Sequence, residues 1–228
     1  IRLLVYCPGD ILYSIKPGKE LLHDVGRFTA DLDEKLGGFS HPFYKTRHFI
    51  WMLVAIPKLR DYTFAVKNKE DRLLVEEVIH KFERDVLGNI DCLEMGMIHG
   101  DINEQNLIVN SDHTCVRAII DFGDSQYSCL IFELFIVLCY MILQARDIEM
   151  GRHVIEGYMS IRKLSDFEKK IVKIGVCARL SQSLVMGAYS HLQDPKNDYV
   201  LVTAEQGWKI LRKLWRMSDD EISSAWGL

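Results

Sequence analysis

Apolar residues recur every three or four positions along several stretches of the chain. Residues 20–36 and 70–86 each show such a stripe, with charged residues between the apolar positions, a pattern typical of amphipathic helices. We expect Gly37-Gly38 to end the first helix in a left-handed cap and residues 39–47 to form a loop. Further helices are predicted at residues 49–54 (ended by Pro57), 130–145, 153–158, 166–191 and 203–217.

Two short apolar runs, residues 107–109 and 116–120, are separated by Asn110-Ser111-Asp112-His113. These four side chains favour tight turns, so the runs predict a β-hairpin. Residues 3–7 predict one more strand, stopped by Pro8-Gly9. The expected fold class is therefore α+β and mainly helical, with a hairpin in the middle of the chain.

The composition favours a globular protein that acts on a small polar molecule. The chain has 228 residues, 48% of them hydrophobic, which is enough to bury the core of one or two domains. With 28 basic and 32 acidic residues, neither sign in long blocks, the charge gives no reason to expect nucleic acid or a membrane as partner. The longest apolar stretch, residues 134–143, is far shorter than the ~20 residues of a membrane-spanning helix.

The six cysteines lie far apart and mostly within apolar runs, and they lack the close pairing of metal sites or of secreted disulfide frameworks. We interpret them as reduced thiols and expect a cytoplasmic protein.

The stretch that carries chemistry runs from His99-Gly100-Asp101 through Asn106 to Asp121. Asp101 precedes the first hairpin strand, Asn106 begins it and Asp121 follows the second, so Asn106 and Asp121 meet at one end of the hairpin. Phosphoryl transfer needs a carboxylate to accept a hydroxyl proton and oxygen ligands for Mg²⁺. Each residue alone is more often a turn or cap residue. The combined pattern is far more demanding and favours a phosphotransferase.

This pattern resembles the aminoglycoside phosphotransferase and choline kinase superfamily and, within it, the hydroxylysine kinases. Beyond the two motifs, the likeness rests on residues 2–9, 49–51, 177–190 and 198–209. The resemblance implies the large, C-terminal lobe of a protein-kinase-like fold, with a catalytic hairpin and a helical bundle. It also implies Mg²⁺-dependent transfer of the γ-phosphoryl of GTP, or of ATP, to the 5-hydroxyl of hydroxy-L-lysine. A choline- or aminoglycoside-directed kinase, and a truncated pseudokinase that binds another protein, are the alternatives.

The same resemblance gives roles to individual residues. Asp101 is implied as the catalytic base, and Asn106 and Asp121 as magnesium ligands. His99 and Glu133 are implied to support the catalytic loop. A buried acid such as Glu133, within an apolar helix, would be costly without partners.

Nucleotide contacts are expected from the backbone near Val5 and Cys7 and from Ile108 and Ile120 of the hairpin. A plain edge strand is the alternative interpretation of the segment that contains Val5 and Cys7.

Four further residues are expected near the acceptor. Asp124 would hold a second metal or a substrate ammonium, unless it is a solvated turn carboxylate. Arg179 would clamp a substrate carboxylate with two N–H groups, unless it is exposed or salt-bridged. Trp51 and Tyr127 would stack on a cation, unless they simply pack in the core.

Residues 1–10 are expected to form a strand linking two lobes, and residues 11–228 the C-terminal lobe. A complete kinase of this type also has a small β lobe with a phosphate-covering loop and a strand lysine. The sequence contains no G-x-G-x-x-G, and no lysine-bearing strand precedes residue 3. Because the first residue is Ile1 rather than Met, we expect a fragment of a longer enzyme, whose small lobe would complete the site, rather than a natural short form.

Overall fold

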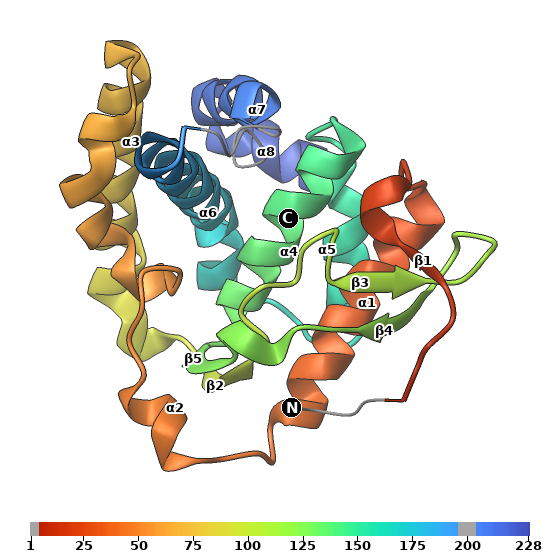
Figure 1. The fold of residues 1–228 in the computed structure, drawn as a ribbon. Coiled ribbons are helices and arrows are strands. Elements are labelled where there is room, and N and C mark those ends of the chain that lie inside the picture. Colours follow the sequence, from red (N-terminus) through yellow and green to blue (C-terminus); the bar gives the residue numbers. More distant parts are fainter. Residues whose placement is uncertain (1–4, 196–203) are drawn as a thin grey trace.

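The computed structural model describes residues 5–195 and 204–228, and most of these residues are helical (Figure 1). The fold is a mainly helical α+β fold, as predicted. The helices are α1 (Lys19–Leu36), α2 (Pro42–Thr46), α3 (Lys69–Asp85), α4 (Ile131–Ala145), α5 (Gly151–Met159), α6 (Asp166–Gln193), α7 (Ala204–Arg216) and α8 (Asp219–Trp226). Short 3₁₀ segments are η1 (Leu12–Ser14), η2 (Leu53–Ala65), η3 (Leu87–Cys92) and η4 (Phe122–Asp124).

The described strands form two small antiparallel sheets. One has the order β1 (Asp10–Ile11), β3 (Leu107–Val109) and β4 (Val116–Ile119), and it contains the predicted hairpin, with Leu107 opposite Ile119. The other, which the sequence did not predict, pairs β2 (Met95–Ile98) with β5 (Gln126–Cys129). The loop carrying His99-Gly100-Asp101 leaves β2 and enters β3, so both sheets fix its ends.

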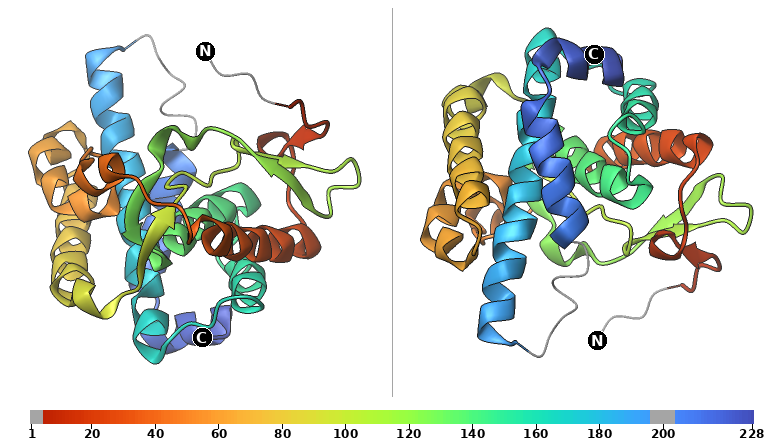
Figure 2. Two further views of the ribbon diagram at one scale, coloured as in Figure 1. Left: turned by 90° about the horizontal axis from the view of Figure 1, so that it is seen from below. Right: turned by 90° about the horizontal axis from the view of Figure 1, so that it is seen from above.

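Helix α4 forms the centre of the core. Twelve of its fifteen residues are buried, because it is apolar on all sides and is surrounded by other elements. Helix α6 packs between α3, α4 and η2, and Figure 2 shows α3 and α6 side by side in both views. By length and composition α6 could cross a membrane, but 78% of its most apolar window is buried in the structure. It is therefore a core helix of the bundle.

The prediction of a strand at residues 3–7 was wrong in the part that the structure describes. Residues 5–8 form no strand, and strand pairing begins at Asp10. Pro8 has no N–H to donate. Gly9, with φ of 155°, passes so close to the hairpin that a Cβ on it would lie 2.3 Å from the Val109 carbonyl oxygen. Residues 3 and 4 of that prediction lie outside the described residues, as do residues 198–203 of the family resemblance.

Three further local predictions were wrong. Gly37 is right-handed, with φ of −56°, and α1 ends by a tightened turn in which Gly37 N–H donates to the Glu34 carbonyl oxygen. Residues 42–46 form α2 rather than loop, with Pro42 in its first turn, where a missing N–H costs nothing. In place of a helix ended by Pro57, the 3₁₀ segment η2 contains this proline.

Helices α1 and α5 cross with their backbones in contact (Figure 1). A Cβ on Gly26 would lie 1.9 Å from the Val154 carbonyl oxygen, and one on Gly157 would lie 1.8 Å from that of His23. Real side chains do not approach so closely, so glycine is required at both positions for this crossing.

Replacing Gly26 by Ala should therefore lower the free energy of unfolding by roughly 2–4 kcal/mol, because the helices must separate to admit one methyl group. Gly38→Ala is the control, because a Cβ at Gly38 meets nothing within 4 Å. Urea denaturation followed by circular dichroism measures both variants. Equal stability of the two variants would contradict the close crossing.

Candidate active site

Glu133, in the first turn of α4, is hydrogen-bonded to the backbone of the loop that follows β2. Glu133 is completely buried, and its carboxylate accepts hydrogen bonds from the N–H groups of His99 and Gly100, the latter at 3.1 Å. Burial raises the pKa of Glu133, while the two N–H donors act in the opposite direction. Asp33 of α1 is buried beside it, and its pKa is also raised, by burial and by the charge of Glu133.

His99 ties the same loop to the end of β4. Its Nε2 lies 3.0 Å from the Ile120 carbonyl oxygen, and its Nδ1 lies 3.3 Å from the Asp101 backbone nitrogen. Since a carbonyl only accepts and an N–H only donates, the ring carries its proton on Nε2. Burial lowers the pKa of His99, so the ring is neutral. This is the position expected for a residue that supports the loop.

The Asp101 carboxylate is held by three donors. Its Oδ2 accepts from Nδ2 of Asn103 at 2.9 Å and from Nδ2 of Asn106 at 3.1 Å. Its Oδ1 accepts from Nη2 of Arg179 at 2.9 Å. The carboxylate is therefore fixed in orientation while keeping lone pairs for a further donor.

Arg179, on α6, is a partner of the loop rather than a free cation. It is 1% exposed, and its Nη1 donates to the Trp51 carbonyl oxygen and to Gln182. The rings of Trp51 and Tyr140 lie 5.4 and 5.3 Å from its guanidinium carbon. The salt-bridged alternative is therefore the one observed, and a contact between Arg179 and a substrate carboxylate stays a prediction.

Asn106 and Asp121 lie together at the end of the hairpin, because Ile120 N–H donates to the Asn106 carbonyl oxygen at 3.0 Å. Asp121 is left-handed, with φ of 62° and ψ of 68°, and accepts from Gly123 N–H. Among the described residues no three His, Cys, Asp or Glu side chains cluster as a metal cage. An amide and a carboxylate still fit Mg²⁺, which takes one or two protein oxygens and completes its octahedron with phosphate and water oxygens.

Asp124 is the last residue of η4. Its Oδ1 is 3.7 Å from Nη2 of Arg47, and burial, together with the charge of Asp101, raises its pKa. Its carbonyl oxygen packs against Gly100, where a Cβ would lie 2.6 Å away. Asp124 is thus a half-buried, ion-paired residue rather than a solvated turn carboxylate.

The residues expected near a nucleotide base lie around the three-stranded sheet. Val5 is 96% exposed, Cys7 and Ile108 are partly buried, and Ile120 is exposed. Their nucleotide contacts stay predictions.

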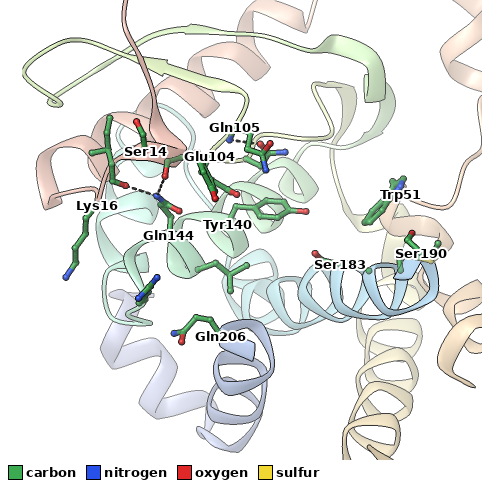
Figure 3. Close-up of a pocket in the computed structure, with 17 residues that line it drawn as sticks. Ser14, Lys16, Trp51, Glu104, Gln105, Tyr140, Gln144, Ser183, Ser190 and Gln206 are labelled. Atoms are coloured by element: carbon green, nitrogen blue, oxygen red, sulfur yellow. Dashed lines mark hydrogen bonds between the residues drawn. The ribbon is translucent and has the colours of Figure 1, made fainter. Parts of the chain in front are cut away.

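A cavity of about 660 Å³ opens beside the loop that joins β2 to β3 (Figure 3). Asn103, Glu104 and Gln105 of the loop form one wall of the cavity. Four residues were expected near the acceptor, and of these only Trp51 is among the described residues that line the cavity. Tyr127 lies on β5 opposite Met97 and is exposed. The remaining lining residues are Tyr13, Ser14, Ile15, Lys16, Tyr140, Leu143, Gln144, Arg146, Ser183, Met186, Gly187, Ser190 and Gln206.

Comparison with known proteins decides the family. Residues 1–164 match the phosphotransferase enzyme family. The chain belongs to this family.

Among the relatives of the chain are the hydroxylysine kinases of Mus musculus, 34% identical over 238 residues, and Xenopus laevis, 35% identical over 240 residues. Both alignments cover 99% of the chain, but the chain spans only 63% and 64% of these two relatives.

Solved structures share the fold. An aminoglycoside phosphotransferase from Alicyclobacillus acidocaldarius is 16% identical, with a TM-score of 0.64 over 96% of this chain and 70% of the other. An amicoumacin kinase, solved in complex with AMP-PNP, Ca²⁺ and Ami, is 14% identical, with a TM-score of 0.63 over 95% of this chain and 66% of the other. Kinases of this family use nucleotide donors with a divalent metal.

The sequence did not predict Glu104, Tyr140 and Lys16 as cavity residues. Glu104 lies inside the motif, but the sequence gives no sign that its carboxylate is buried. Tyr140 lies on a helix that is apolar on all sides, where a tyrosine looks like core, and Lys16 reaches the cavity only through the path of residues 13–16.

Arg179 offers a direct test of how Asp101 is held. Arg179→Met leaves the Asp101 charge without its cation and should lower the free energy of unfolding by about 3–5 kcal/mol. Arg117→Met is the control, since Arg117 is exposed on β4, and it should change stability by less than about 0.5 kcal/mol. Both are measured by urea denaturation. A loss at position 179 as small as that at position 117 would contradict the buried ion pair.

Glu133 predicts a pH dependence of stability. Its pKa is about 8 in the folded protein, against an ordinary value of 4.5. Between these values the folded protein binds more protons than the unfolded chain at this site, so stability falls as pH rises from about 5 to 8. Glu133→Gln removes this titration and should show a smaller fall.

Urea denaturation at several pH values from 5 to 8 measures this difference. The control is Glu149→Gln, at an exposed carboxylate, which should follow the wild type. If Glu133→Gln also follows the wild type, the pKa of Glu133 is not raised.

Proposed function

We propose that the protein transfers the γ-phosphoryl group of a nucleoside triphosphate, GTP in the first instance, to the 5-hydroxyl of hydroxy-L-lysine. The observation that carries the proposal is the fixed Asp101 carboxylate, which accepts a hydrogen bond from Asn106 and belongs to the loop whose residues 103–105 line the cavity. The name of the relatives supplies the acceptor.

In the proposed reaction, Asp101 accepts the proton of the acceptor hydroxyl as its oxygen attacks the γ-phosphorus. The bond from the γ-phosphorus to the bridging oxygen breaks, and a nucleoside diphosphate leaves. Arg179, Asn103 and Asn106 keep the Asp101 carboxylate in place. Asn106 and Asp121 would hold Mg²⁺, which neutralises charge on the donor phosphates.

The compartment is part of the proposal. All six cysteines are free, and Cys129, Cys139 and Cys177 are buried, which suits a reducing environment. We therefore place the reaction in the cytoplasm. Choline and aminoglycosides are the acceptors to be compared with hydroxylysine, because they would use the same Asp101 chemistry.

Asp101→Asn should lower kcat about 10²- to 10⁴-fold, because an amide cannot take the hydroxyl proton. The assay follows release of nucleoside diphosphate with Mg²⁺, GTP or ATP, and hydroxylysine, using protein expressed from its complete reading frame. Asp112→Asn is the control, because Asp112 is an exposed carboxylate in the hairpin turn, and it should match the wild type. Undiminished turnover by Asp101→Asn, or no turnover by the wild type with any acceptor, would refute the proposal.

A further inference from the structure

Glu104 is a buried carboxylate that forms no ion pair with any residue the structure describes. It is 8% exposed, and among the described residues its Oε2 has no hydrogen-bond partner. Its backbone is fixed, because Tyr13 N–H donates to the Glu104 carbonyl oxygen at 2.7 Å. A buried acid of this kind is costly unless a cation binds to it.

The cavity of about 660 Å³ is where such a cation can bind. Glu104 is the acidic side chain among the described residues that line it. Tyr140 and Trp51 also line it, but their rings already lie against the Arg179 guanidinium. The exposed residues Lys16 and Arg146 also line it, and Figure 3 shows Lys16 and Trp51 at opposite sides of the site. The cavity therefore offers a negative group near the catalytic loop and positive groups farther out.

Glu104 lies close to Asp101. Three positions separate them in the sequence, and the segment between them is folded tightly by the hydrogen bonds from Asn103 and Asn106 to Asp101. A molecule whose hydroxyl meets Asp101 can thus present a cation to Glu104 only if the cation lies a short distance from that hydroxyl.

We infer that Glu104 binds an ammonium group on the carbon next to the reacting hydroxyl, and that the site thereby selects 1,2-amino alcohols. This inference rests on the proposed phosphoryl transfer at Asp101. In hydroxylysine the ammonium concerned is the one at C6, beside the C5 hydroxyl. The α-carboxylate at the other end of the molecule extends toward Lys16 and Arg146.

The test compares hydroxylysine with 2-amino-5-hydroxyhexanoic acid, which keeps the hydroxyl and lacks the C6 ammonium. The wild type should have a much lower KM for hydroxylysine. Glu104→Gln should raise that KM about 10- to 100-fold, the usual effect of losing a charged hydrogen bond, and should change the KM for the analogue by less than about twofold. Glu149→Gln, at an exposed carboxylate outside the cavity, is the matched control and should alter neither KM.

Three results would overturn the inference. The first is a wild type that shows no preference for hydroxylysine over the analogue, and the second is a Glu104→Gln variant that keeps this preference. The third is an equal effect of Glu104→Gln on both acceptors, which is what a purely structural acid would give. If the wild type phosphorylates neither acceptor, the proposed function fails, and calorimetric titration with the two compounds decides the inference separately. Tighter binding of hydroxylysine that is lost in Glu104→Gln supports it, and equal or absent binding of both compounds overturns it.

Discussion

The site depends on one buried contact, in which the Glu133 carboxylate accepts the N–H groups of His99 and Gly100. Glu133 lies in the first turn of α4, the most completely buried helix of the fold, so the position of the loop is set by the core itself. A buried acid costs free energy unless donors surround it, and the loop supplies these donors. The loop and helix α4 therefore stabilise one another, and together they fix the position of Asp101.

Asp101 and Glu104, both in this loop, have different surroundings, and these surroundings suit them to different roles. Asp101 has a guanidinium and two amides on its oxygens, so it is fixed and charge-compensated without a ligand. Glu104, three residues later, has a buried oxygen with no partner among the described residues. The surroundings of Asp101 suit a group that accepts a proton at a defined point, and those of Glu104 suit a group that binds a cationic ligand.

The sequence was sufficient wherever structure follows from local periodicity or turn chemistry. The long helices and the hairpin at 107–119 were predicted because their apolar spacing and their turn residues are local signals. The β2–β5 pairing was not, because two strands of four residues pair across about 30 positions and neither has a distinctive pattern. The contact between Asp101 and Arg179 was not predicted either. The two residues are 78 positions apart in the sequence, and no local pattern around either residue indicates the contact.

The central claim is that the loop from His99 to Asn106 serves phosphoryl transfer to a hydroxyl group. Phosphorus NMR of a mixture of hydroxylysine, Mg²⁺, nucleoside triphosphate and protein from the complete reading frame tests it most directly. We expect a phosphate monoester whose phosphorus is coupled to the proton on C5, formed in equal amount with nucleoside diphosphate. Nucleoside diphosphate accompanied only by inorganic phosphate, or an unchanged spectrum, would contradict it.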